Sequence, residues 1–232
     1  MKRTPVDVVL LNHTPDPERA IAAAARLCYA PIGAAELLDT MSDDAVRRVL
    51  RTILTSGHLS ALEHASYTFA IDGVSRAMTH QLVRHRLASY NQQSQRYVSF
   101  AEEPAFVMPP DVAADPAAAE RFAEAASAAF AAYRELMELG VAAEDARYLL
   151  PNATETKIAV TMNVRELLHF FELRCCNRAQ WEIRAVAHRM LELAEPTAPY
   201  IFMDAGASCR RGPCREGAMT CGDPYPKAPR RD

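Results

Sequence analysis

The sequence lacks the features that direct a chain out of the cytoplasm or into a membrane. Its apolar runs all stay short of the roughly 18 residues that a transmembrane helix needs. Lys2 and Arg3 are followed by Thr4 and Pro5 rather than by the apolar stretch of a signal peptide. We therefore expect a cytoplasmic protein that has no membrane partner.

Glycine is scarce, and the loops that glycine builds around phosphates are absent. None of the 8 glycines forms GxGxxG or GxxxxGK(S/T), the loops that hold phosphates against a helix N-terminus. If the chain binds a dinucleotide, a Rossmann turn does not hold it. Arginine side chains remain as the phosphate-binding groups, because their planar donors suit phosphate and carbonyl oxygens.

Lysine is nearly missing as well. It occurs at three positions among the 26 basic residues, which leaves 23 arginines, and alanine is abundant. This composition indicates a codon bias, so only arginines that cluster with other polar groups point to a site. The formal net charge of −3 argues against a general nucleic-acid binder, since such proteins carry a basic excess. We expect no nucleic-acid partner.

What the chain does contain is typical of a globular protein. Its 232 residues are 50% hydrophobic and 24% charged, with no internal repeat and no inner linker. Short alternating segments and helical periodicities predict a mixed α+β fold. We expect one domain over residues 1–205 and a tail over residues 206–232 that is rich in glycine, proline and cysteine.

The expected elements follow from periodicity and from helix-capping residues. Alternation predicts strands over 8–11, 66–71 and 157–162. Helical spacing predicts helices over 16–27, 43–56, 76–86, 116–139 and 164–175, and a further helix that Asn177 caps. The helix over 76–86 is expected to unwind into a polar loop.

That polar loop, RHRLASYNQQSQRY over 84–97, is the most unusual stretch of the chain. Only Leu87 and Ala88 in it are plainly apolar, so no face of it can form ordinary core. Two interpretations stay open on composition alone: a solvated loop, or a site for an anionic ligand.

Four segments together resemble the flavin-dependent thymidylate synthase family. The polar stretch reads RHR-x7-S-x-R, which is similar to the signature of that family. GHLSALEH lies upstream of it, and DARYLLP, MNVREL and ELR-x5-QWEIR follow in the expected order. The resemblance covers about residues 22–194.

The resemblance implies both a fold and a reaction. The fold is an antiparallel twisted sheet flanked by helices, assembled as a homotetramer with shared active sites. The reaction converts dUMP to dTMP with methylenetetrahydrofolate as carbon donor, FAD as hydride carrier and NADPH as reductant. No cysteine attacks the pyrimidine in such enzymes; the protein supplies position and electrostatics.

The resemblance also implies the residues of the site. The positions that match dUMP-binding residues are Gln81, Arg84, Gln92, Ser94, Arg96, Arg147 and Arg174. The positions that match FAD-binding residues are His58, Ser60, Glu63, Arg84, His85, Arg86, Leu87, Asn91, Gln92, Asn163, Arg165, His169 and Leu173.

Chemistry suggests roles for several of these residues. Arg96 and Arg147 suit the phosphate, and Arg174 suits a uracil carbonyl, where it would act catalytically by stabilising charge that develops on the ring. Ser94 is interpreted as a hydrogen-bonding residue because no base is evident for it. The chain departs from the family pattern at His169, where asparagine is common, at Arg178, where histidine is common, and at Cys28, where a small hydroxyl residue is common.

The cysteines of the tail leave several states open. Cys209-x4-Cys214-x6-Cys221 is too irregular for a zinc signature, which usually shows C-x2–4-C pairs. Cys175 and Cys176 would complete a four-sulfur set if the tail folded back. Free thiols, disulfides and a metal all stay open, and no metal ligand is assigned. Two other functions are alternatives to this enzyme: a single-strand or RNA-binding module built on 84–97, and a zinc-dependent interaction module in the tail.

Overall fold

The computed structural model describes residues 6–228, and its contacts divide the chain into two compact units. Unit 1 contains Ile71–Arg84 and Tyr90–Ala159, together with the start of the described chain. Unit 2 contains Val8–Ala70, His85–Ser89 and the chain from Val160 onward. Residues 1–5, on which the expectation of no signal peptide partly rests, lie outside the described chain.

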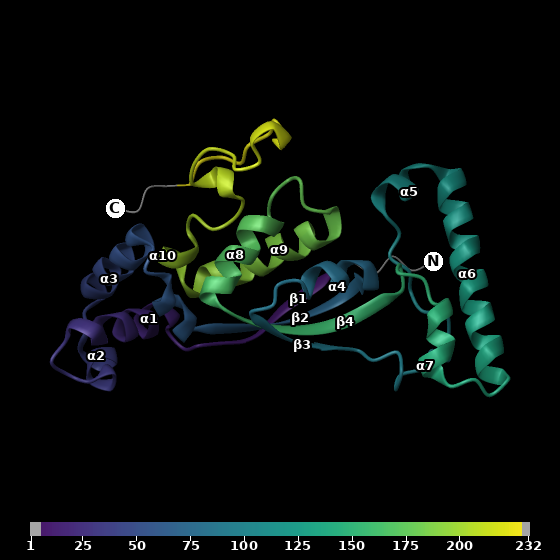
Figure 1. The fold of residues 1–232 in the computed structure, drawn as a ribbon, viewed down its shortest axis with the longest axis horizontal. Helices are drawn as coiled ribbons and strands as arrows, with labels where there is room; N and C mark the ends of the chain where they lie inside the picture. The colour runs from purple at the N-terminus through teal and green to yellow at the C-terminus, as the bar shows by residue number, and fades with distance from the viewer. Residues whose placement is uncertain (1–5, 229–232) are drawn as a thin grey trace. The chain divides into compact units, whose positions relative to one another are not determined.

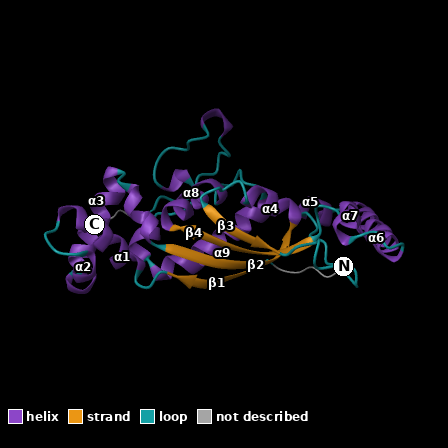
Figure 2. Ribbon diagram, turned by 60° about the horizontal axis from the view of Figure 1, so that its bottom comes forward, coloured by secondary structure: helices purple, strands orange, loops and turns teal. Residues whose placement is uncertain are grey.

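Four strands form one antiparallel sheet in the order β1-β2-β4-β3, as predicted for the family (Figure 2). The strands are β1 Asp7–His13, β2 Ser66–Ser75, β3 Ala88–Gln92 and β4 Glu155–Asn163. β2 and β4 alternate between buried and more exposed side chains, as period 2 requires.

The structure corrects the prediction that the whole polar stretch is a loop, because β3 lies inside it. The sequence of β3 has no hydrophobic alternation, so pattern analysis could not find the strand. Backbone pairing stabilises it: beyond its end, Gln93 N donates to Lys157 O of β4 at 2.9 Å. The Gln92 side chain is also anchored, since Nε2 donates to Thr79 Oγ1 at 3.0 Å and to Thr156 Oγ1 at 3.3 Å.

Unit 2 packs helices around an aromatic core. Tyr67, Phe171 and Phe202 are fully buried, and the ring of Phe202 meets both other rings edge to face. The α-helices of this unit are α1 Pro17–Arg26, α2 Ala34–Thr40, α3 Asp43–Ser56, α8 Val164–Arg174, α9 Trp181–Ala194 and α10 Pro199–Phe202, with α8 beside α9 (Figure 1). Its 3₁₀-helices are η1 Leu27–Tyr29, η2 Leu59–His64, η4 Glu195–Thr197, η5 Ser208–Arg210 and η6 Gly217–Met219.

Unit 1 has a smaller core under its long helix. Phe130 and Tyr133 stack there, and Phe106, Ala126 and Ala146 complete the buried cluster. The helices of this unit are α4 Arg76–Leu82, α5 Pro110–Ala114, α6 Pro116–Glu138, α7 Ala143–Ala146 and the 3₁₀-helix η3 Arg147–Leu149, with α5 and α7 beside α6 (Figure 1).

Local signals placed most helix ends correctly. The side chains of Asp16, Ser42 and Asn163 accept backbone N–H groups at the starts of α1, α3 and α8. Gly57 ends α3 with φ 76°, a left-handed conformation that favours glycine. No helix within the described residues is long and apolar enough to cross a membrane.

Two helix ends were predicted wrongly. α4 ends at Leu82 rather than at 86. The Tyr90 hydroxyl donates to the Leu82 carbonyl at 2.8 Å and takes the place of the next helical hydrogen bond. α9 is capped by Gln180 rather than by Asn177: Gln180 Oε1 accepts from the N–H groups of the first turn. The Asn177 amide instead donates to Asp223 O at 3.1 Å.

Candidate active site

The predicted site residues divide between the two units along ligand lines. The dUMP-binding predictions lie in unit 1, except Arg174, which lies in unit 2. The FAD-binding predictions lie in unit 2, except Arg84, Asn91 and Gln92. Unit 1 therefore presents most of the groups predicted to bind dUMP, and unit 2 most of those predicted to bind FAD.

In unit 1, one acidic residue joins the two arginines that are predicted to hold phosphate. Arg96 Nε lies 2.6 Å from Glu144 Oε2, and Arg147 Nε donates to the backbone oxygen of Glu144 at 3.0 Å. The Arg96 side chain is 54% exposed, so this ion pair is accessible to solvent. An incoming phosphate would replace the Glu144 carboxylate as the partner of Arg96 without having to open a buried pair.

A third arginine, Arg76, was missed by the sequence analysis. Its Nη1 donates to Gln93 O at 3.3 Å inside the polar stretch. Burial lowers the pKa of Arg76, and the positive charge of Arg147 lowers it further. Arginine is so abundant in this chain that a single arginine outside a motif does not indicate a site, and Arg76 lies outside every motif.

The remaining dUMP-binding predictions lie around α4 and β3. Gln81 is half-buried on α4, Arg84 is exposed just after it, and Gln92 is half-buried on β3, where Asn91, predicted for FAD, is exposed. Ser94 Oγ accepts from the backbone N–H of Arg96 at 3.1 Å, which fits a residue that shapes the turn. Gln95 Nε2 is buried without a hydrogen-bond partner among the described residues. A polar ligand would satisfy such a group.

In unit 2, three side chains form a hydrogen-bonded series. Arg174 Nε donates to His85 Nε2 at 3.0 Å, and His85 Nδ1 lies 3.1 Å from Glu166 Oε1. Because Nε2 accepts, the imidazole is neutral with its proton on Nδ1, which donates to the carboxylate. His85 and Glu166 are only 5% and 6% exposed, so this series fixes the orientation of the Arg174 guanidinium.

The neutral state of His85 predicts how stability depends on pH. Burial lowers the pKa of His85, and the charge of Arg174 lowers it further, against the opposing effect of the hydrogen bond to Glu166. Below about pH 6.5 the unfolded chain binds a proton at this histidine that the folded chain does not. The free energy of unfolding should therefore fall as the pH falls from about 6.5 through the lowered pKa of the folded state.

Urea denaturation at pH 7.5 and pH 5.5 would measure this effect. The fall in unfolding free energy between the two pH values should be smaller for His85→Gln than for the wild type. Burial also lowers the pKa of His188, so part of the pH dependence should survive in the variant. An equal fall in both proteins would show that His85 is not held neutral.

The other FAD-binding predictions surround η2 and α8. Arg165 Nη1 on α8 donates to Glu63 Oε1 on η2 at 2.5 Å, and both side chains are about half exposed. His58 and Ser60 are exposed at the start of η2. Asn163 caps α8 through its Oδ1, which accepts from Glu166 N at 2.9 Å.

These residue types fit a flavin nucleotide. Arg86 and Arg165 are exposed cations suited to a pyrophosphate. Leu87 and Leu173 are 69% and 45% exposed, so both would offer apolar surface to a ring system. The ring of His169 lies 6.0 Å from that of His85, so a histidine is accommodated where the family often has asparagine.

Two departures from the family pattern are explained by their positions. Arg178 Nη1 donates to the carbonyl of Met219, and its Nε lies 3.8 Å from Glu216, so this side chain is engaged with the tail. Cys28 is exposed on the 3₁₀-helix η1.

Comparisons with known proteins agree with this arrangement. The family model described as "Thymidylate synthase complementing protein" matches residues 9–200. The chain is 58% identical to the flavin-dependent thymidylate synthase of Geobacter sulfurreducens, over 93% of each chain. It is 46% identical to that of Clostridium tetani, over 94% of this chain and 93% of the other.

A solved structure has the same fold. It is a UMP/dUMP methylase from Streptomyces cacaoi bound with 5-Br dUMP, with a TM-score of 0.74 and 26% identity. The match covers 88% of this chain and 97% of that one. The chain thus belongs to the flavin-dependent thymidylate synthase family.

Proposed function

We propose that Arg96 and Arg147 of unit 1 hold the phosphate of dUMP and that Arg174 of unit 2 is the catalytic cation. As a flavin-dependent thymidylate synthase, the protein methylates dUMP to dTMP with FAD as its cofactor. Methylenetetrahydrofolate as the carbon donor and NADPH as the reductant complete the proposed reaction.

The proposal for the phosphate rests on the arrangement of Arg96 and Arg147 around Glu144. A phosphate carries more charge than one carboxylate and offers three acceptor oxygens, so it can engage both guanidinium groups. The charge of Arg147, together with burial, lowers the pKa of Arg76, so a third guanidinium contributes to the positive potential around Arg147. The 5-Br dUMP in the Streptomyces cacaoi structure shows that a nucleotide of this class binds to this fold.

The proposal for the flavin rests on the exposed residues of unit 2. Arg86 and Arg165 would hold the pyrophosphate, and Leu87 and Leu173 would cover apolar ring surface. When bound, FAD supplies the hydride chemistry that no side chain can provide. The protein binds the ligands, orients them and excludes water.

Arg174 has the geometry of an oriented electrostatic catalyst. A guanidinium beside a uracil carbonyl would stabilise negative charge on the ring as C5 becomes nucleophilic. Its Nε–H is already used by His85, which leaves the two terminal nitrogens for the substrate. We also propose that the protein is cytoplasmic and a homotetramer whose active sites are shared between subunits.

The decisive experiment is an assay of NADPH oxidation that depends on dUMP, with FAD and methylenetetrahydrofolate present and dTMP measured as product. The purified protein should be yellow, and NADPH should bleach it. A colourless protein that cannot be reconstituted with FAD and forms no dTMP would contradict the proposal.

Replacing Arg147 by alanine should weaken dUMP binding. A hydrogen bond to a charged group contributes about 1.5–3 kcal/mol, so the KM for dUMP should rise about 10- to 100-fold. The kcat at saturating dUMP should change little, because phosphate binding is the same in the ground and transition states. Steady-state kinetics over a range of dUMP concentrations would measure both.

Arg121→Ala is the matched control for this variant. Arg121 lies in unit 1 on α6, where its side chain is 80% exposed and pairs only with Glu124 in the next turn. Its removal should leave the KM for dUMP unchanged. If Arg147→Ala behaves like Arg121→Ala, the phosphate is held elsewhere.

A further inference from the structure

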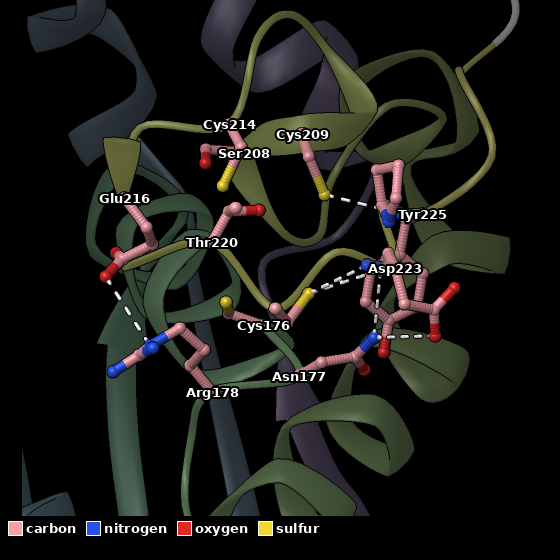
Figure 3. A pocket seen from close by; sticks show the side chains of 12 residues that line it. Cys176, Asn177, Arg178, Ser208, Cys209, Cys214, Glu216, Thr220, Asp223 and Tyr225 are labelled. Carbon is pink, nitrogen blue, oxygen red and sulfur yellow. Dashed lines mark hydrogen bonds and ion pairs between the residues drawn. The ribbon is translucent and has the colours of Figure 1, made fainter. Parts of the chain in front are cut away.

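Four cysteines in unit 2 line one small cavity. Cys176 follows α8, and Cys209, Cys214 and Cys221 lie in the tail. Figure 3 shows the side chains of Cys176, Cys209 and Cys214 pointing into the same hollow. The cavity has a volume of about 10 Å³, which is room for about one water-sized atom.

The tail that carries three of these cysteines has little apolar core of its own. From 211 to 224 almost every residue is exposed. Polar contacts hold it to the helices instead: Arg211 and Arg215 pair with Glu172 of α8 at 2.6 and 2.5 Å. His188 of α9 shares a hydrogen bond of 3.0 Å with the Tyr225 hydroxyl. A short segment so poor in buried surface usually depends on a cross-link or a metal for its order.

Backbone amides point at two of the four sulfurs. Asp223 N donates to Cys221 Sγ at 3.4 Å, and Tyr225 N donates to Cys209 Sγ at 3.4 Å. Gly222, with φ 74°, permits the turn that brings the Asp223 amide back to Cys221. Hydrogen bonds of this kind from the surrounding chain are typical of metal ligands, because they fix the orientation of the ligand atoms.

We propose that Cys176, Cys209, Cys214 and Cys221 bind one structural zinc ion. Four sulfur ligands in tetrahedral geometry are a structural zinc site, and thiolates select soft or borderline ions such as Zn²⁺. On binding, the four thiols release four protons and form four zinc–sulfur bonds, which leaves the centre with a charge of 2−. The guanidinium of Arg178, which also lines the cavity, offsets part of this charge.

Zinc binding must draw the four sulfurs closer together. As they stand, no three His, Cys, Asp or Glu side chains within residues 6–228 are close enough to hold an ion, and each cysteine is a free thiol. Cys214 and Cys221 lie in the exposed part of the tail, so they can move toward an ion with little loss of packing. Metal binding would then order the tail, as in other small metal-bound segments.

The other two cysteines do not belong to the site. Cys175 is 1% exposed and does not line the cavity. Cys28 lies on η1 in an exposed position. The sequence alone left a metal as one of three open states, because the fourth sulfur comes from Cys176 at the end of α8, far from the tail along the chain.

Zinc content per chain tests the proposal without any dependence on enzyme activity. Full-length protein, purified with reductant and without chelator, should contain about one zinc per chain by plasma mass spectrometry. The double variant Cys214→Ser/Cys221→Ser should lose this zinc, whereas Cys28→Ser should keep it. Three results would each overturn the proposal: zinc near zero in the wild type, zinc retained by the double variant, or iron with acid-labile sulfide in place of zinc.

A titration of the wild type keeps the test decisive if the double variant fails to fold. A mercurial that modifies thiols should release one zinc as about four thiols react, and a zinc-binding dye would follow the release. Replacement by Co²⁺ should give the intense visible absorption of a tetrahedral cobalt–thiolate centre. Release of zinc with two thiols or fewer would show that these four cysteines do not bind it together.

Discussion

Arg174→Ala is expected to lower kcat by about 10²–10³-fold, the loss typical of removing one donor that stabilises a developing negative charge. The guanidinium acts on the transition state, so the KM for dUMP should change far less than kcat. The proposed role depends on the orientation that His85 and Glu166 give this guanidinium as well as on its charge.

Two substitutions separate these contributions. Arg174→Lys keeps a positive charge but removes both the planar donors and the Nε–H that binds His85, so it should recover only part of the rate. Arg189→Ala is the matched control, because Arg189 is a half-exposed arginine of unit 2 that pairs with Glu192. Turnover numbers at saturating dUMP, with flavin content confirmed by absorbance, would compare them. Activity of Arg174→Ala near the wild-type value would remove the catalytic role.

Glu166→Ala is expected to lower the free energy of unfolding by about 3 kcal/mol. The variant removes the carboxylate that accepts from His85 Nδ1, and a buried hydrogen bond to a charged group contributes about 1.5–3 kcal/mol. It also leaves a void beside buried aromatic rings, since the ring of Phe170 lies 5.0 Å from that of His85. Urea denaturation at neutral pH would measure the loss.

The conservative variant Glu166→Gln tests which property of Glu166 matters. Its amide oxygen can still accept from His85 and its volume is nearly the same, so it should lose only about 1 kcal/mol. Glu192→Ala, an exposed site on α9, should stay within about 0.5 kcal/mol of the wild type. If Glu166→Ala is no less stable than Glu192→Ala, the hydrogen bond between Glu166 and His85 does not stabilise the folded state.

Local patterns predicted the parts of the fold that are decided within a few residues. The caps at Ser42 and Asn163 and the stop at Gly57 depend on one side chain or one φ angle, so sequence alone located them. β3 and the start of α9 depend on distant partners: Lys157 pairs beyond β3, and Asp223 in the tail engages Asn177. Such partners are far away along the chain, so the local pattern of a short segment does not predict which of them its backbone and side chains will bind.

The candidate site divides in the same way. The resemblance of four segments identified the family and named Arg96, Arg147 and Arg174 as functional candidates. It did not identify Arg76 or Glu144, which lie outside the four segments, and it gave Glu166 no role although Glu166 lies within MNVREL. Their roles arise only where the chain brings charges together.

The sequence by itself determined the α+β class, the family and the set of polar residues from which the site is built, because these depend on composition, periodicity and motif order. Only the tertiary structure decided the protonation state of His85, the orientation of Arg174 and the gathering of four cysteines around one cavity. Burial and hydrogen-bond geometry set those properties, and both arise from residues that lie far apart along the chain.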